Sequence, residues 1–333
     1  MSLEISICSG DYDRIQGLKS GTVAIEGCTL SYRNHHPAET FRRLFDDHEF
    51  DVAEMSFSSY LVALGQGGFP YRAIPVFLSR VFAHGSIYLG PQSTISEPGD
   101  LKGKRVGAPN YHFTRGLCVR GLLADEYGVA PGDMLWRTGG VDSPGGLGYL
   151  PIEAPANVEI EPIGADQTLA ALLLAGEIEA IVSYRDPEIF SQRRPGVRRL
   201  FADFRSLEKV YFQKTGIFPI MHVVGIRETL LAAYPWLAGA VYRGFAEAKA
   251  LALPRLVDLD ALAVMLPWLV AEAEATIELM GADYWPYGVA PNRATLEAQT
   301  RWSFEQGLTP RRYAPEEIFA EMEPAMEPAM EAR

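Results

Sequence analysis

DLKGKRVGAP, residues 100–109, is the stretch that decides the fold: a short turn, a basic pair and then an apolar strand predicted over residues 105–108. A loop follows, and Thr114 can cap a helix that runs to about Tyr127. Further along, residues 167–176 have a helical pattern that ends at a glycine and leads into a strand at 178–183. Two units of this kind predict an α/β segment with parallel strands.

The flanking sequence has the same alternation of strands and helices. Short apolar or alternating runs predict strands at 3–7, 22–32, 50–56, 74–77 and 86–89, and a helix at 38–48. A further strand is expected within 209–226, and the chain is mostly helical from Glu228. The order predicts two α/β domains, the second inserted into the first. We expect residues 1–89 plus 219–333 in lobe 1, residues 90–203 in lobe 2, and a return crossing at 204–218.

Composition narrows the class of protein. The chain has 333 residues, 48% apolar and 22% charged, which is typical of a globular protein. Its 30 basic and 42 acidic residues give a net charge of -12, which disfavours nucleic acid as a partner. The most apolar stretch, 261–271, is too short to span a bilayer, so no membrane association is expected.

The expected location is cytoplasmic. Residues 1–14 lack a basic region followed by an apolar one, and acidic residues begin at position 4. The cysteines are odd in number and widely spaced, which predicts reduced thiols: Cys8, Cys28 and Cys118.

Several common catalytic motifs are missing from the sequence. It contains no GxxxxGK[ST], GxGxxG or GxSxG motif, and its six histidines form neither HExxH nor HxH. Nucleotide hydrolysis, serine esterase chemistry and a structural zinc are therefore not expected. A metal ion held by distant histidine and carboxylate groups stays open, and no organic cofactor is expected.

The candidate site lies in the loops that follow strands, because ligands of open α/β sheets bind beyond the carboxyl ends of the strands. These loops are GDYDR at 10–14, EMSFSSY at 54–60, PNYHFTR at 109–115 and SYRDP at 183–187. Arginine grips carboxylates in a bidentate way, so the arginines on such loops predict an anionic ligand, with surface ion pairs as the alternative: Arg14, Arg80, Arg115 and Arg185.

Histidines and one carboxylate complete the candidate set. His84, His112 and His222 are expected to converge on the cleft, although each alone could be a core or hinge histidine. Glu54 adds a carboxylate at a strand end, and the nearby Ser58 and Ser59 add hydroxyls or form a helix cap. His35 and His36 precede a proline and could be solvated.

Five segments carry a family resemblance. FDVAEMSFSSYL (50–61), DLKGKRVGAP (100–109), TGIFPIMH (215–222), LPWL (266–269) and DYWPYGVAPNR (283–293) occur in that order. Together they resemble the 4,5-dihydroxyphthalate decarboxylases, aromatic-acid enzymes with the two-lobe α/β fold of type II periplasmic binding proteins and a central cleft. The likeness runs from about residue 5 to 319. Where the family usually has Arg-His-Ser, this chain has Ala83-His84-Gly85.

The resemblance implies a non-oxidative decarboxylase of a hydroxylated aromatic dicarboxylic acid. The expected substrate is 4,5-dihydroxyphthalate or a close analogue, and the products are a hydroxybenzoate such as protocatechuate and carbon dioxide, as in phthalate degradation. The alternatives are a cytoplasmic solute-binding protein without chemistry and another lyase of this fold, such as a menaquinone-pathway dehydratase. A homo-oligomer is compatible with the sequence.

Decarboxylation of an aromatic ring needs a proton donor for the ring carbon, because an aryl carbanion is otherwise left behind. We expect His84 or His112 as the acid and Glu54 as the acceptor of a phenolic proton. Arg80 and Arg185 are expected to hold carboxylates from opposite sides of the cleft. The expected substrate-binding residues are Arg14, Ser58, Ser59, Arg80, Tyr111, Thr114, Arg115, Arg185 and His222.

Overall fold

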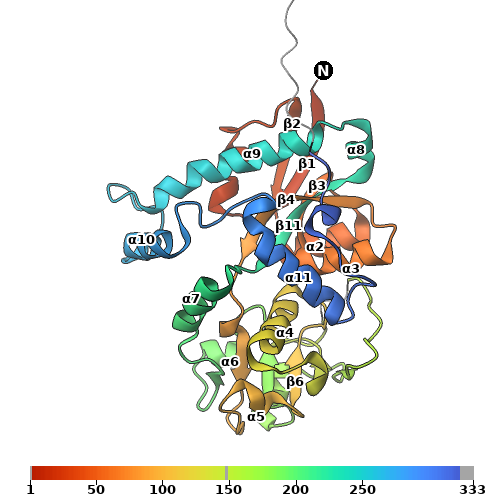
Figure 1. The fold of residues 1–333 in the computed structure, drawn as a ribbon, viewed down its shortest axis with the longest axis vertical. Helices are drawn as coiled ribbons and strands as arrows, with labels where there is room; N and C mark the ends of the chain where they lie inside the picture. The colour runs from red at the N-terminus through yellow and green to blue at the C-terminus, as the bar shows by residue number, and fades with distance from the viewer. Residues whose placement is uncertain (1, 147–148, 323–333) are drawn as a thin grey trace, which may run out of the picture.

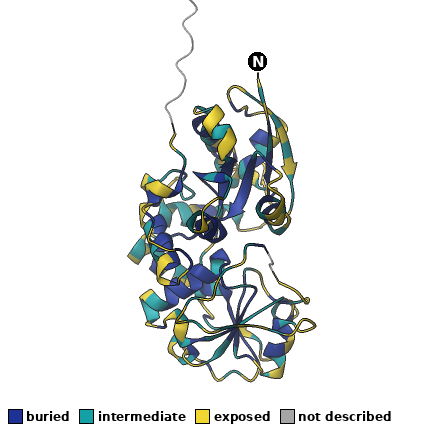
Figure 2. Cartoon of the chain, turned by 90° about the vertical axis from the view of Figure 1, so that its right-hand side faces the viewer, coloured by how far each residue is buried: buried dark blue, intermediate teal, exposed yellow. Residues whose placement is uncertain are grey.

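The structure is a computed structural model that describes residues 2–146 and 149–322. The last residues of the expected first lobe, 323–333, lie outside this range. The described chain forms two lobes, each built around one sheet, which are stacked along the long axis of the molecule (Figure 1). Buried strands occupy the middle of each lobe, and exposed residues lie on the outer helices (Figure 2).

The sheet of the first lobe has five strands in the order β2-β1-β3-β11-β4. These are β1 (Leu3–Ser9), β2 (Cys28–Asn34), β3 (Val52–Ser56), β4 (Tyr71–Arg80) and β11 (Ile220–Arg227). β1 runs parallel to β2 and β3, whereas β11 is antiparallel to both β3 and β4. A strand from late in the sequence therefore fills the position between β3 and β4.

The second lobe has a six-stranded sheet in the order β10-β5-β9-β6-β7-β8. Its strands are β5 (Ile87–Leu89), β6 (Arg105–Ala108), β7 (Leu135–Thr138), β8 (Ile160–Pro162), β9 (Ala180–Val182) and β10 (Arg198–Arg199). The expected division placed residues 87–89 in lobe 1. β5 instead pairs with β9 and β10, so the chain has already crossed to the second lobe before this strand.

Helices cover both sheets and connect the lobes. They are α1 (Gln16–Ser20), α2 (Pro37–Asp47), α3 (Phe57–Gln66), α4 (Thr114–Tyr127), α5 (Leu169–Ala175), α6 (Glu188–Ser191), α7 (Phe204–Thr215), α8 (Glu228–Ala233), α9 (Leu237–Ala252), α10 (Leu269–Met280) and α11 (Arg293–Glu305). In the described part of the chain, none of them combines the length and apolar character that crossing a bilayer requires.

The contact between α11 and α4 holds the lobes together, and the two helices lie side by side in Figure 1. Gly121 of α4 faces the Trp302 ring so closely that a Cβ atom would lie 2.2 Å from it. On either side of this contact, Gln299 Nε2 donates to the Ile220 carbonyl and Arg120 Nε donates to Gln306 Oε1, at 2.8 and 2.7 Å. A C-terminal helix thus fixes the second lobe against the first.

Candidate functional site

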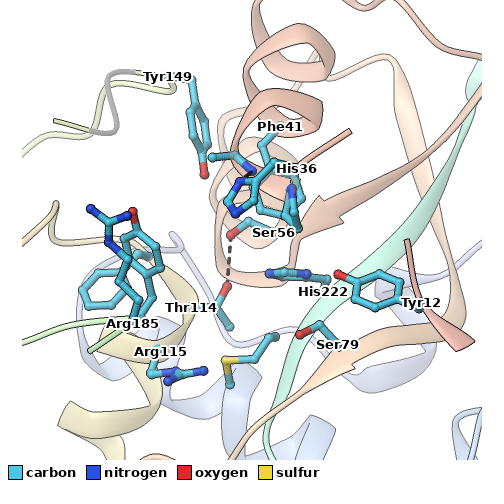
Figure 3. Close-up of a pocket in the computed structure, with 15 residues that line it drawn as sticks. Tyr12, His36, Phe41, Ser56, Ser79, Thr114, Arg115, Tyr149, Arg185 and His222 are labelled. Carbon is cyan, nitrogen blue, oxygen red and sulfur yellow. Dashed lines mark hydrogen bonds between the residues drawn. The ribbon is translucent and has the colours of Figure 1, made fainter. Parts of the chain in front are cut away.

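A cavity of about 350 Å³ lies between the two lobes. The first lobe lines it with Tyr12, His36, Pro37, Ala38, Phe41, Ser56, Ser79, Met221 and His222. The second lobe lines it with Phe113, Thr114, Arg115, Tyr149, Tyr184 and Arg185. The side chains point inward from the two lobes (Figure 3). Any ligand in this cavity therefore contacts both lobes.

Three helices begin at the cavity. His36 is the N-cap of α2, Ser56 is the N-cap of α3, and Phe113 precedes the first residue of α4. Phe113 supplies no side-chain cap to the 14-residue helix α4, and Phe113, Thr114 and Arg115 at the start of this helix line the cavity. Because the N-terminus of a helix carries partial positive charge, this arrangement favours an anionic ligand.

Two arginines of the second lobe add full positive charge. Arg115 is the second residue of α4, and Arg185 follows β9. Arg115 is partly buried, and burial lowers the pKa of its guanidinium. Arg185 is 54% exposed and pairs with the buried Asp142 at 3.3 Å. Both arginines lie across the cavity from Tyr12 and His222 (Figure 3).

The opposite wall contains a buried carboxylate paired with a histidine. Glu54 is 0% exposed, and its Oε1 lies 2.6 Å from Nδ1 of His222. The strand register explains this pair: Ser56 of β3 is opposite His222, so Glu54 lies diagonally from His222 on the same face. Because Nδ1 contacts Glu54, Nε2 is the ring nitrogen that can act on a ligand.

Two more donors complete the hydrogen bonding of Glu54. The Gly10 N–H donates to Oε2 at 2.8 Å, and the Tyr12 hydroxyl donates to Oε1 at 2.7 Å. Burial raises the pKa of the Glu54 carboxyl, but the charge of His222 and the hydrogen bonds outweigh it, and the net pKa is lowered. Glu54 is therefore an ionised carboxylate that orients the imidazole.

Ser56 and Thr114 connect the two walls. Their hydroxyl oxygens are 3.0 Å apart, and this hydrogen bond joins the end of β3 to the start of α4 (Figure 3). The Ser58 N–H also donates to the Thr114 hydroxyl, at 3.1 Å. Ser58 and Ser59 are themselves fully buried and do not line the cavity. Their predicted contact with substrate is not supported by their positions, since they lie buried in the first turn of α3, whose N-cap is Ser56.

The structure argues against His84 and His112 as proton donors. His84 is 2% exposed and packs edge-on against Phe201 and Tyr211, with ring centroids 5.5 and 5.2 Å away. His112 lines a neighbouring cavity together with Tyr111. Burial lowers the pKa of each histidine to about 4, so both are uncharged near neutrality. Neither lines the cavity that contains His222.

Arg80 and Arg14 also lie outside the cavity. The guanidinium of Arg80 is buried and donates to Asn292 Oδ1 at 2.7 Å and to the Phe218 carbonyl at 2.6 Å. Arg14 Nε donates to the Leu78 carbonyl at 2.8 Å, and its guanidinium stacks on the Tyr12 ring at 4.1 Å. The expectation that Arg80 grips a substrate carboxylate is thus not supported, because the guanidinium is buried outside the cavity and both of its terminal nitrogens donate to internal acceptors.

Four of the predicted residues do line the cavity: Thr114, Arg115, Arg185 and His222. Tyr12, His36 and Tyr149 line the cavity but are not among the predicted residues, although the GDYDR loop that contains Tyr12 belongs to the predicted site. Tyr149 of the second lobe reaches the first lobe, where its ring stacks on Phe45 with centroids 5.3 Å apart.

A metal site has no support among the residues that the structure describes. Within 2–146 and 149–322, no three His, Cys, Asp or Glu side chains come together as a set of ligands.

Comparison with known proteins identifies close relatives. The chain is 38% identical over 317 residues to the 4,5-dihydroxyphthalate decarboxylase of Comamonas testosteroni, covering 95% of this chain and 96% of that relative. It is 38% identical over 201 residues to the protein of the same name from Pseudomonas putida, covering 60% of this chain and 78% of that one. No model of a protein family matches the chain.

Solved structures confirm the predicted fold class. The periplasmic aliphatic sulphonate binding protein SsuA of Escherichia coli aligns with a TM-score of 0.52 and 15% identity, covering 96% of this chain and 97% of that one. The Candida albicans CA3427 gene product, described as having the generic periplasmic binding protein fold, aligns with a TM-score of 0.51 and 9% identity, covering 93% and 92%. At such low identity these alignments show the two-lobe fold alone.

Substitution of Arg80 or Arg185 by lysine distinguishes an arginine that stabilises the fold from one that binds a ligand. Arg80→Lys should lower the free energy of unfolding by about 1.5–3 kcal/mol, because an ammonium group cannot reproduce the buried fork of hydrogen bonds. Arg185→Lys should change stability by no more than about 0.5 kcal/mol but weaken binding of an aromatic dicarboxylate roughly tenfold or more. Urea unfolding and titration calorimetry measure the two effects. If Arg80→Lys lost affinity at unchanged stability, Arg80 would be a binding residue after all.

Proposed function

This chain belongs to the 4,5-dihydroxyphthalate decarboxylase family, and we propose that it converts 4,5-dihydroxyphthalate, or a close hydroxylated analogue, to a hydroxybenzoate such as protocatechuate and carbon dioxide. The observation that carries this proposal is the division of the cavity into two walls. Anion-binding groups occupy the second lobe, and the Glu54–His222 pair faces them from the first.

The second lobe suits the carboxylates of the substrate. Arg115 and Arg185 supply forked donors, and the start of α4 supplies backbone N–H groups. A charge-assisted hydrogen bond contributes about 1.5–3 kcal/mol, so two arginines can select an aromatic dicarboxylate over a neutral phenol. The start of α2, which His36 caps, adds the partial positive charge of a helix N-terminus on the other wall.

Carbon dioxide can leave only when the ring accepts the electron pair of the broken bond. We assign His222 as the acid that protonates the ring carbon bearing the departing carboxylate, using Nε2. The ionised Glu54 stabilises the imidazolium through Nδ1. An oxygen para to that carbon stabilises the positive charge on the ring.

The remaining steps balance without an organic cofactor. The bond between the ring and the carboxylate breaks, its electron pair restores the aromatic ring, and neutral carbon dioxide departs. His222 regains its proton from solvent. The apolar and aromatic lining, which includes Phe41, Phe113 and Met221, favours the loss of a carboxylate charge as an uncharged molecule.

We also propose a cytoplasmic location. The three cysteines are free thiols in the structure, which is typical of proteins in a reducing compartment.

The purified protein should release carbon dioxide from 4,5-dihydroxyphthalate. Incubation in deuterium oxide should place one deuteron on the vacated ring carbon, because the proton comes from an exchangeable group. Mass spectrometry of the product and a carbon dioxide assay measure both results. If a panel of hydroxylated phthalates is bound but never decarboxylated, the solute-binding alternative is correct.

His222→Gln should lower kcat about 10²- to 10⁴-fold, because it removes the positioned acid. His84→Gln is the control, since it is the same substitution at a histidine that lies outside the cavity. We expect this control to keep the parent kcat. Steady-state kinetics with thermal unfolding of each variant tests the assignment. Parent-like turnover by His222→Gln together with loss of turnover by His84→Gln would reverse it.

A further inference from the structure

Glu54 Oε1 is shared by two residues that both line the cavity. The Tyr12 hydroxyl donates to it at 2.7 Å, and His222 Nδ1 lies 2.6 Å away. Oε2 is occupied by the Gly10 N–H at 2.8 Å. One carboxylate oxygen therefore connects the histidine assigned as the acid to a phenolic hydroxyl at the same wall. In Figure 3, Tyr12 and His222 lie next to each other across from the arginines.

The position of Tyr12 is built into the fold. A Cβ atom at position 10 would lie 2.7–2.8 Å from the Tyr12 ring and its hydroxyl, so only glycine leaves room for this ring. Behind the ring, Arg14 stacks on Tyr12 at 4.1 Å and is itself held by the Leu78 carbonyl. Tyr12 is thus clamped between a glycine and an arginine, with its hydroxyl directed to Glu54.

The protonation states of the pair suit proton transfer. Burial raises the pKa of Tyr12, and the negative charge of Glu54 raises it further. The net pKa of Glu54 is lowered. Tyr12 is therefore a neutral phenol beside an ionised carboxylate. Its hydroxyl can accept a proton from a ligand only if it donates its own proton to Glu54 at the same time.

The proposed function requires that the hydroxyl para to the departing carboxylate release electron density into the ring. Building on that function, we propose that Tyr12 is a catalytic residue that takes the proton of this para hydroxyl while passing its own proton to Glu54. The acid and the base of the reaction then act through a single carboxylate.

The proposed reaction has two steps, and every proton and electron pair is accounted for in each. First, the substrate O–H bond breaks as Tyr12 accepts that proton and hands its own to Glu54. In the same step His222 Nε2 protonates the ring carbon, and a neutral dienone forms at the para oxygen. Second, the bond to the carboxylate breaks, carbon dioxide leaves, and the electron pair restores the aromatic ring. The para oxygen recovers a proton from Tyr12 as Glu54 returns the one it received, and solvent reprotonates His222.

We call the proton transfer from the substrate hydroxyl through Tyr12 to Glu54 the relay. The relay defines the substrate class. A carboxylate is lost only from a ring carbon with a free hydroxyl para to it. For 4-hydroxyphthalate, which has a single hydroxyl, the relay predicts loss of the para carboxylate and formation of 3-hydroxybenzoate. Loss of the other carboxylate would give 4-hydroxybenzoate.

Tyr12→Phe tests the relay against a merely structural role. We expect kcat for 4,5-dihydroxyphthalate to fall about 10²- to 10⁴-fold near neutrality, with KM nearly unchanged. Tyr32→Phe is the matched control, because Tyr32 is a tyrosine of the same lobe whose hydroxyl bonds Ser9 at 2.8 Å and which does not line the cavity. This control should retain the parent kcat.

The pH dependence of kcat distinguishes a proton-transfer role of Tyr12 from a merely structural role. Without Tyr12 the substrate must lose its phenolic proton to solvent. The deficit in kcat of Tyr12→Phe relative to the parent should therefore shrink about tenfold per pH unit as the pH approaches the ordinary pKa of a phenol, about 10. The charged and titratable groups around Tyr12 are Glu54 on β3, His222 on β11, Arg14 beside the ring and Tyr32 on β2. They are present in both proteins, so the ratio of parent to variant isolates Tyr12.

The possible outcomes separate the proposal for Tyr12 from the proposed function on which it rests. A deficit that narrows with rising pH, with 3-hydroxybenzoate from 4-hydroxyphthalate, supports the relay. A deficit that stays constant with pH, or parent-like turnover by Tyr12→Phe, overturns it while the decarboxylase function stands. The product of 4-hydroxyphthalate is read with the parent enzyme, so 4-hydroxybenzoate would overturn the relay even if Tyr12→Phe failed to fold. An inactive parent would instead remove the proposed function itself.

Discussion

The fully buried carboxylate of Glu54 is the constraint on which the site depends. A buried charge costs several kcal/mol unless its oxygens are hydrogen-bonded and a partner of opposite charge is close. Its three hydrogen-bond partners come from two separate parts of the chain: Gly10 and Tyr12 in the loop after β1, and His222 on β11. The charge is therefore tolerated only where β1, β3 and β11 meet. The same contacts that stabilise the carboxylate fix the reactive groups at the cavity wall.

This constraint explains why a strand from residue 220 onward lies in the middle of the first sheet. β11 is antiparallel to β3, and that register places His222 diagonally from Glu54. The helix α11 follows and packs on α4, which carries Thr114 and Arg115 at its start. The returning C-terminal region thus supplies His222, the proposed acid, and also packs against the second lobe, which carries Arg115 and Arg185. The hydrogen bond between Ser56 and Thr114 closes the connection at the cavity itself.

The sequence predicted local units better than side-chain directions. The strand 105–108 and the helix 114–127 agree with β6 and α4, because hydrophobic periodicity is a local property. The expected cap differs: Thr114 is the first residue of α4, and Phe113 is its N-cap. Only part of the expected strand 22–32 is β2, and the short strand β10 has no pattern to detect. The division between lobes differed at 87–89 because pairing with β9 is not a local property.

The candidate site shows the same division between local and long-range information. The rule that ligands bind after strands selected Arg115 and Arg185, and His222 was selected as a histidine of the returning strand; all three line the cavity. The predicted residues His84 and Arg80 lie outside it, because their surroundings come from distant residues such as Tyr211 and Asn292. The proposed function also has a consequence for product release. In the proposed reaction the substrate carries two carboxylates and the product only one, so departure of carbon dioxide removes one of the proposed charged contacts with the arginines and weakens binding once the chemistry is complete.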